Sequence, residues 1–236
     1  MAFVVSFALP AFAGPPYVTD DPEPTDYKHF EIYLFADGTI TRNDNAGQTG
    51  VDFNYGAAPN LQLTAVLPLA YDRPADGTRA LGRGNIELAA KVRLLHQESF
   101  GWDVSVFPRI FLSSPSSAAP ERHSSLLLPI WLEKDWNEWA TFGGGGCVLH
   151  PGGAAKNSCL MGWAVTRQVL PRLQLGAELS HQTADSGGKR ASTGIGAGAR
   201  YDVSEHLHLV GSIGPGIQHS ADTNQYSWYA ALLMTF

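Results

Sequence analysis

The feature that most constrains this chain is a two-residue period of apolar side chains. In GNIELAAKVRLL, residues 84–95, apolar positions alternate with Glu87, Lys91 and Arg93. RLQLGAELSH, residues 172–181, repeats the alternation. An amphipathic helix would show a period of 3.6 residues, whereas a strand turns successive side chains to opposite faces. These segments therefore predict strands of a sheet with one apolar and one polar face.

Alternating runs continue along the chain, and many reach roughly ten residues, whereas strands of soluble folds are typically five or six residues long. Short and long connections also alternate, as in up-and-down membrane barrels. A two-layer soluble sandwich would share the alternation but not the run lengths or the connections. We therefore predict an all-β fold, a transmembrane antiparallel up-and-down β-barrel of about twelve strands, over residues 28–236. The runs cover residues 30–37, 51–56, 61–71, 86–96, 102–112, 125–134, 139–149, 159–168, 173–181, 192–201, 206–217 and 226–236.

Composition and aromatic placement favour a membrane. Charged residues make up 16% of the chain, below the roughly 25% of soluble domains. The net charge of -6 and the lack of a Lys/Arg run argue against a nucleic-acid partner. Aromatic residues gather near the run ends, as an interfacial girdle requires. They are Tyr71, Trp102, Trp131, Trp136, Trp139, Tyr201 and Trp228.

The N-terminus predicts export. Residues 2–9 are apolar and precede a small-x-small site at residues 11–13, which together indicate a signal peptide over residues 1–13. The usual positively charged start is missing, so we expect the natural start to lie upstream. No stretch reaches the roughly 20 apolar residues of a membrane-spanning helix. Residues 14–27, which are rich in proline and acid, predict an extended segment.

The C-terminus ends in YSWYAALLMTF, where every second residue is apolar and the last is aromatic. We interpret Trp228, Met234 and Phe236 as an assembly signal, because the pattern resembles the C-terminal signal of bacterial outer-membrane barrels. The resemblance implies recognition by the barrel-assembly machinery. It places the protein in the outer membrane of a Gram-negative bacterium, with the lipid bilayer as a partner.

Residues 14–35, GPPYVTDDPEPTDYKHFEIYLF, resemble the start of a family of small outer-membrane proteins that are named as transporters. That family is associated by name with the meta-cleavage pathway of phenol degradation. The resemblance runs along the whole barrel and implies the barrel fold and the membrane location. It brings no catalytic residues and no cofactor.

The polar face of the strands predicts a charged lumen. One interpretation is a pore in which opposed charges select among permeants, and the other is a charge-paired interior that fills the barrel. The acids Asp20, Asp21, Glu23 and Asp26 form a candidate plug that meets inward Arg or Lys, the alternative being a loose periplasmic leader. The predicted lumen-lining residues are Glu31, Asp52, Glu87, Lys91, Arg93, Asp103, Arg109, Glu133, Glu178 and Arg200, with His29 beside them.

Glycines and cysteines add two expectations. The glycines of residues 143–146 and 194–198 either leave room inside the barrel or ease its curvature. Cys147 and Cys159 flank one predicted hairpin on the same parity, and an oxidising periplasm favours a disulfide that braces their loop. GIGAGA, residues 194–199, fits a nucleotide-binding fingerprint but lacks the following helix that this motif needs.

These patterns predict a channel for passive uptake of small molecules, aromatic or apolar ones among them, and no enzyme. The alternatives are a non-conducting structural or interaction barrel that displays its loops, and an outer-membrane lipid hydrolase. No residue stands out as the hydrolase nucleophile, since Ser180 and His181 point to opposite faces of one strand. His123, His150, His181 and His219 fall in or beside long loops, and we predict no metal site among them.

Overall fold

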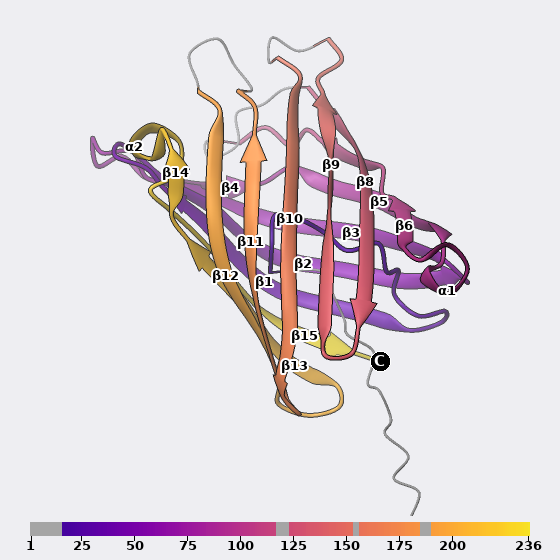
Figure 1. Ribbon diagram of the computed structural model, residues 1–236. Coiled ribbons are helices and arrows are strands. Elements are labelled where there is room, and N and C mark those ends of the chain that lie inside the picture. The colour runs from indigo at the N-terminus through magenta and orange to yellow at the C-terminus, as the bar shows by residue number, and fades with distance from the viewer. Residues whose placement is uncertain (1–15, 117–122, 153–155, 185–189) are drawn as a thin grey trace, which may run out of the picture.

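The computed structural model describes residues 16–116, 123–152, 156–184 and 190–236. The predicted signal peptide lies outside the described residues. All strands join one antiparallel sheet, which closes where β1 pairs with β15 (Figure 1). The strands are β1 (Phe30–Ile40), β2 (Asn45–Ala58), β3 (Leu61–Asp72), β4 (Ala80–Arg83), β5 (Ile86–Leu95), β6 (Asp103–Val106), β7 (Arg109–Leu112), β8 (Ser125–Trp136), β9 (Trp139–Leu149), β10 (Ser158–Leu170), β11 (Leu173–Gln182), β12 (Ser192–Asp202), β13 (Leu207–Gly214), β14 (Gly216–Gln218) and β15 (Tyr226–Thr235).

The prediction of a twelve-stranded antiparallel barrel is confirmed, because β4 with β5, β6 with β7, and β13 with β14 each complete one traverse of the wall. Pro108 and Pro215 interrupt two of these traverses, since proline has no N–H for the strand ladder. The wall stays hydrogen-bonded at these sites. Ala90 donates its N–H to the Pro108 carbonyl at 3.2 Å, and Ile195 donates to the Pro215 carbonyl at 3.1 Å.

Two predicted loops are wrong in extent. Residues 38–50 were expected to be mostly loop, yet β1 continues to Ile40 and β2 begins at Asn45. The polar hairpin is sustained by paired backbone groups, with Gly38 opposite Gly47. β4 likewise lies within the expected loop 72–84 and pairs with the end of β3.

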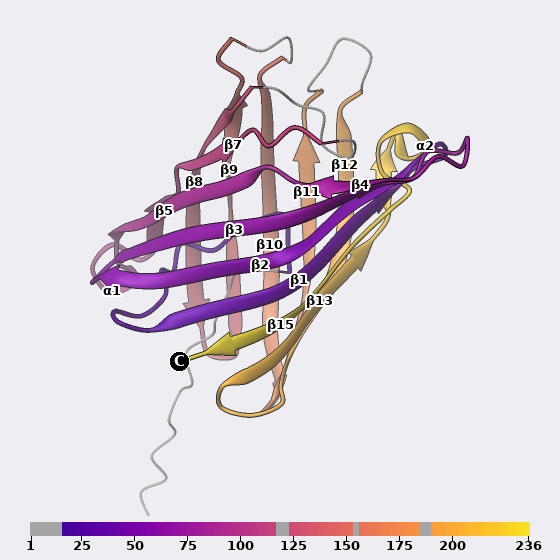
Figure 2. The same ribbon diagram turned by 180° about the vertical axis from the view of Figure 1, so that it is seen from behind.

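The connections divide between two rims. The tight turns between β2 and β3, β8 and β9, and β10 and β11 share one rim with the C-terminus (Figures 1 and 2). The short helix α1 (Gln97–Phe100) lies at this rim, and α2 (Ser220–Thr223) lies at the opposite, long-loop rim. Neither helix of the described residues is long and apolar enough to cross a membrane.

The outer face carries the apolar side chains. Leu67 is 59% exposed and Ile213 is 61% exposed, as expected for residues that face lipid rather than water. Near the short-turn rim, Lys134 lies over the Trp102 ring at 5.5 Å, and Arg167 lies over the Trp139 ring at 5.1 Å. Such side chains can extend their charge to the membrane surface while their stems remain in apolar surroundings.

The prediction that Trp131 belongs to the aromatic girdle is wrong. Its side chain is 1% exposed and points inward, because it shares parity with Glu133 on β8. The interior is also less uniformly polar than expected. An apolar cluster lines its β1, β3, β13 and β15 side, made of Tyr33, Phe35, Val66, Val210, Ala231 and Leu233.

Candidate functional site

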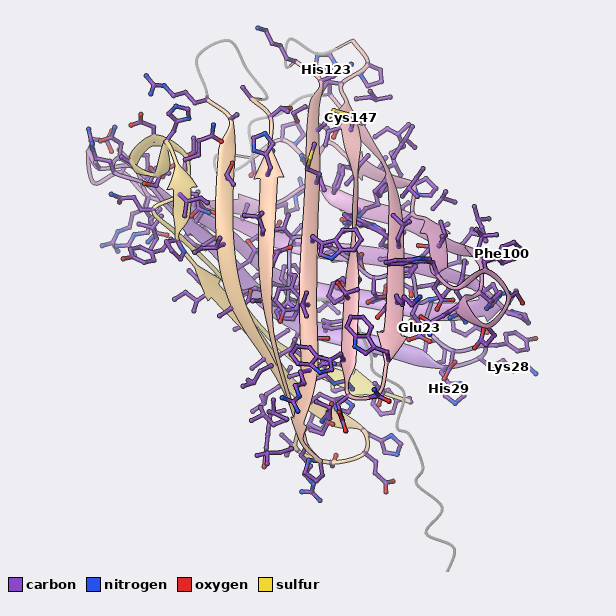
Figure 3. All side chains as sticks on the ribbon, in the orientation of Figure 1. Glu23, Lys28, His29, Phe100, His123 and Cys147 are labelled. Carbon is purple, nitrogen blue, oxygen red and sulfur yellow. A yellow bond between two sulfur atoms is a disulfide. The ribbon has the colours of Figure 1, made fainter. Side chains whose placement is uncertain are left out.

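The most informative site is the interior, where residues 16–27, here called the N-terminal segment, cross before β1 begins (Figure 1). Thr19 and Asp21 are each 1% exposed, although neither belongs to a strand. The segment contacts wall strands that are far apart in sequence. Thr19 donates a hydrogen bond to Glu178 on β11, and Asp20 accepts one from Lys91 on β5. The side chains of the segment, among them Glu23, are drawn in Figure 3.

The first part of the segment is held by β11 and β13. The Glu178 carboxylate accepts the N–H of Val18 at 3.1 Å and the N–H of Thr19 at 2.6 Å, as well as the Thr19 hydroxyl. Ser212 on β13 donates its hydroxyl to the Pro16 carbonyl at 2.6 Å. A carboxylate that accepts several donors gives a charge-assisted attachment, stronger than bonds between neutral groups.

The middle of the segment is held by one buried cation. Lys91 on β5 lies 3.0 Å from Asp20 and 3.3 Å from Asp21, and it also donates to the Glu23 carbonyl at 3.3 Å. Arg93, two residues along β5, lies 3.5 Å from the Glu23 carboxylate. Because β5 turns Lys91 and Arg93 to the same inward face, both meet the acids of the segment.

Glu23 lies outside the membrane-spanning strands, and its ionisation is sensitive to its surroundings. Burial raises the pKa of Glu23 to about 7, although the nearby Arg93 favours the charged form. The acids Asp135, Asp103 and Asp26 raise this pKa further. Docking of the segment is therefore linked to a proton near neutral pH.

Glycines in the wall make room for the segment. A Cβ at Gly198 on β12 would lie 2.7 Å from the Tyr17 ring, closer than real Cβ contacts. A Cβ at Gly176 on β11 would collide with the Tyr17 hydroxyl, and one at Gly162 on β10 would collide with the Thr19 hydroxyl. The wall thus has sockets for these two side chains of the segment.

The last part of the segment reaches β2 and β3. Thr25 donates its N–H to the Gln62 side chain at 2.8 Å, and Gln62 donates in turn to Asn54 and Thr64. Asp26 is exposed and, within the described residues, forms no ion pair. Only Asp20, Asp21 and Glu23 of the four candidate plug acids therefore meet a wall cation.

The remaining predicted lumen residues lie on the interior walls. Arg109 binds both Glu87 oxygens, at 2.6 and 3.1 Å. Asp103 lies 3.7 Å from Arg93. The Glu133 side chain is buried, and its Oε1 has no hydrogen-bond partner among the described residues. The others bond locally, Glu31 to Tyr33, Asp52 to Asn54, and Arg200 to Asp202.

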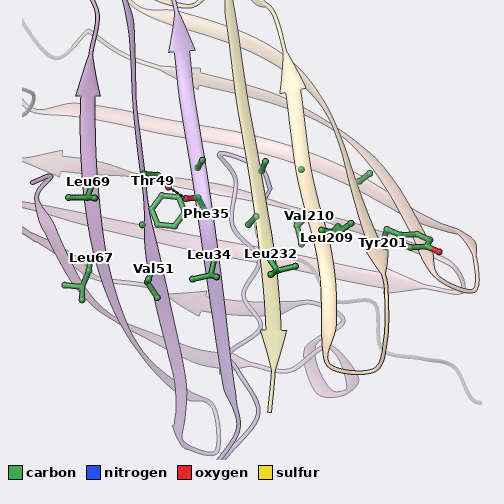
Figure 4. Close-up of a pocket in the computed structure, with 16 residues that line it drawn as sticks. Leu34, Phe35, Thr49, Val51, Leu67, Leu69, Tyr201, Leu209, Val210 and Leu232 are labelled. Atoms are coloured by element: carbon green, nitrogen blue, oxygen red, sulfur yellow. Dashed lines mark hydrogen bonds between the residues drawn. The ribbon is translucent and has the colours of Figure 1, made fainter. Parts of the chain in front are cut away.

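A polar cavity of about 270 Å³ lies between the segment and the long-loop rim. Pro16, Tyr17 and Val18 border it on the segment side, and strands β1, β11, β12, β13 and β15 form its wall. A second hollow, of about 930 Å³, lies on the outer face (Figure 4). Leu34, Leu67 and Leu232 surround it, so this hollow faces the lipid and is separate from the interior.

The two cysteines lie directly opposite each other on β9 and β10 and form a disulfide, with Cα atoms 3.9 Å apart. Figure 3 places Cys147 at the long-loop rim, with His123 nearby. His181 bonds to the Thr193 hydroxyl at 2.8 Å, whereas Ser180 lines the polar cavity. Within the described residues, no group of three or more His, Cys, Asp or Glu could hold a metal ion.

The predicted assembly signal lies on the closing strand. Phe30 and Phe236 exchange two backbone hydrogen bonds, of 2.9 and 3.0 Å, at the end of the β1 and β15 pair. Trp228 packs over Gly38 of β1, where a Cβ would lie 2.8 Å from the indole nitrogen. Met234 pairs with Ile32. All three predicted signal residues therefore lie along the closing seam.

Several interior contacts were missed from the sequence. The sockets at Gly162 and Gly176 and the bonds from Thr19 to Glu178 join residues that no local pattern connects. Gly198, in contrast, belongs to a glycine run for which room inside the barrel was one of two expectations. Gln62 and Thr64 carried a usable signal, because they occupy the inward parity of a strand whose outward residues are apolar. Polar inward positions without charge should thus have joined the predicted lumen set.

Comparisons with known proteins agree with this architecture. No family model matches the sequence, and a search of curated proteins finds no match. An outer membrane channel from Pseudomonas putida F1 is 13% identical and has a TM-score of 0.73, with coverage of 92% of this chain and 98% of that one. KdgM porin is 6% identical with a TM-score of 0.58, and NanC porin is 8% identical with a TM-score of 0.56. Each porin match covers 86% of this chain and nearly all of the porin, 99% and 98%.

At these identities the likeness concerns the fold. The chain has the fold of outer-membrane β-barrels, and its apolar outer face is suited to contact with lipid.

Proposed function

We propose that this protein is an outer-membrane channel for passive uptake of small molecules, and that the N-terminal segment is its plug. The observation that carries the proposal is the attachment of the segment inside a barrel whose outer face is apolar. The segment is held largely by hydrogen bonds and ion pairs to Glu178, Lys91 and Arg93. Water can replace polar contacts of this kind when the segment leaves, so the attachment is suited to reversible closure.

The neighbouring folds support the same proposal, since the matched structures are described as a channel and porins. We further propose that the permeants are small aromatic or apolar molecules, as the family resemblance implies through its association with phenol degradation. If the segment stays in place, such molecules would leave through the wall rather than through the lumen.

The competing proposal is a non-conducting barrel that displays its loops. The apolar interior cluster around Tyr33, Phe35 and Leu233 favours it, because a packed interior stabilises a barrel without a route for solutes. Conduction therefore has to be measured directly.

The test compares the full-length protein with a variant that lacks residues 14–26, in planar bilayers and in liposomes loaded with small solutes. We expect low conductance from the full-length protein and a severalfold higher conductance after deletion. Equal flux from both would remove the plug from the proposal. A folded barrel without conductance in either form would reject the channel.

Two alanine substitutions provide a matched pair for the plug. Gly198→Ala introduces a Cβ 2.7 Å from the Tyr17 ring, so we expect it to displace the segment and raise conductance. Gly194→Ala is the control on the same strand, because its Cβ would meet no atom nearer than 3.5 Å. Equal conductance of the two variants would contradict the socket model.

A further inference from the structure

The polar cavity beside the segment exists because the inward residues around it are small. Gly194 and Gly196 on β12, the glycines of the GIGAG run, both line the cavity, as does Gly214 on β13. Serines at positions 180, 212 and 227 complete this part of the wall. A Cβ at Gly196 would meet only a Glu178 oxygen at 3.9 Å, so even the nearest wall atom leaves open space there.

The charge of the cavity wall has one sign. Asp37 and Glu178 line it, and no Lys, Arg or His among the described residues does. Asp37 accepts a hydrogen bond from Gln48 at 3.1 Å, and Glu178 accepts its bonds from backbone and hydroxyl donors of the segment. Neither carboxylate forms an ion pair within the described residues. The interior cations Lys91 and Arg93 of β5 are paired with other acids, Lys91 with Asp20 and Asp21 and Arg93 with Asp103.

Aromatic rings border the same space. Tyr17 of the segment and Tyr229 of β15 both line the cavity, and Tyr229 lies directly opposite Asp37 in the strand pairing. The face of an aromatic ring attracts a cation, and its flat surface packs against another ring. The cavity therefore combines negative charge, ring faces and hydroxyl groups in about 270 Å³.

We propose that this cavity binds a small organic cation, an ammonium group attached to an aromatic or apolar body. The ammonium would lie between Asp37 and Glu178, and the body would pack on Tyr17 and Tyr229. A role of this cavity in uptake rests on the proposed channel function, in which the cavity would be a selective binding site for permeants beside the plug. Binding itself can be measured without conduction, so the two proposals can fail separately.

The experiment is isothermal titration of the full-length protein in detergent micelles with three probes of similar shape. Benzylammonium carries a positive charge, benzyl alcohol is neutral, and benzoate is negative. We expect benzylammonium to bind at least about tenfold more tightly than benzoate, with the alcohol between them, because two carboxylates attract the cation and repel the anion. Titration into empty micelles measures partition of each probe into detergent.

Variants locate the binding. Asp37→Asn should weaken benzylammonium binding about tenfold and leave benzyl alcohol nearly unchanged, because it removes charge but little volume. Gly196→Leu should weaken both probes, because its side chain fills the cavity. Asp76→Asn is the control, since Asp76 bonds to Thr78 in an exposed loop away from the cavity.

Three results would overturn the proposal. One is benzoate binding as tightly as benzylammonium, and another is unchanged benzylammonium binding in both the Asp37→Asn and Gly196→Leu variants. The third is the same signal from empty micelles. Selective binding by a protein that conducts nothing would keep the cation site and reject only the channel.

Discussion

Replacing Lys91 with glutamine should release the N-terminal segment. The wild-type ammonium is buried, with its side chain 5% exposed, and lies within 3.3 Å of both Asp20 and Asp21. Glutamine is one bond shorter and carries no charge, so it can donate to one oxygen at most and cannot balance two carboxylates. The docked segment of the variant would therefore hold uncompensated charge in a water-poor interior.

The size of the effect follows from the burial of the pair. Removing one partner of a buried ion pair costs about 3 to 5 kcal/mol. At about 1.4 kcal/mol for each factor of ten, this cost shifts the equilibrium between docked and released segment by roughly two to three and a half orders of magnitude. A segment docked almost all the time in the wild type would then be released for a large part of the time.

Conductance in planar bilayers and protease cleavage within the segment provide two independent measurements. We expect Lys91→Gln to approach the conductance of the variant that lacks residues 14–26 and to be cleaved faster than the wild type. Arg109→Gln is the matched control, because it removes a lumen cation whose hydrogen bonds go to Glu87 of the wall rather than to an acid of the segment. Wild-type conductance and wild-type protection in Lys91→Gln, beside a conducting deletion variant, would refute the reasoning.

Three further predictions address the pH dependence of segment docking, the disulfide and the C-terminal residue of the barrel. Docking of the segment should weaken as pH rises through about 7. Burial raises the pKa of Glu23 from 4.5 to about 7, so protonation of Glu23 stabilises the docked segment, and this contribution is complete only below about 4.5. A conductance that falls between pH 6 and 8 would contradict this prediction. Cys147→Ser should lower barrel stability by about 2 to 3 kcal/mol with conductance unchanged, because a disulfide across 12 residues restricts the unfolded chain; the shift of the unfolding temperature on unheated and heated gels would measure it. Phe236→Ala should reduce the amount of barrel in the outer membrane severalfold but allow refolding in detergent, and equal losses in both settings would point to stability rather than to an assembly signal.

The barrel could be predicted because period-two alternation is a local property, written into each strand. Glu87, Lys91 and Arg93 predicted an inward face before any neighbour was known. The position of Trp131 could not be predicted from its place near a run end, since aromatic residues also fill interiors. Parity with Glu133 carried the better signal.

The interior was harder to predict because its contacts span great distances in sequence. Thr19 and Glu178 are 159 positions apart, and the need for glycine at position 198 is explained only by its contact with the Tyr17 ring. Charge alone suggested that acids of the segment would meet inward cations, but it could not assign Lys91 to Asp20 and Asp21. Complementary shape, such as a ring seated on two glycines, leaves no trace in a single strand pattern.

The bond between Cys147 and Cys159 also records how this part of the sheet was put together. The two residues are direct neighbours across β9 and β10. A slip of one position would turn one sulfur to the opposite side of the sheet, out of reach of the other. The disulfide can therefore form only in barrels whose β9 and β10 are paired in the correct register, and once formed it holds that register covalently.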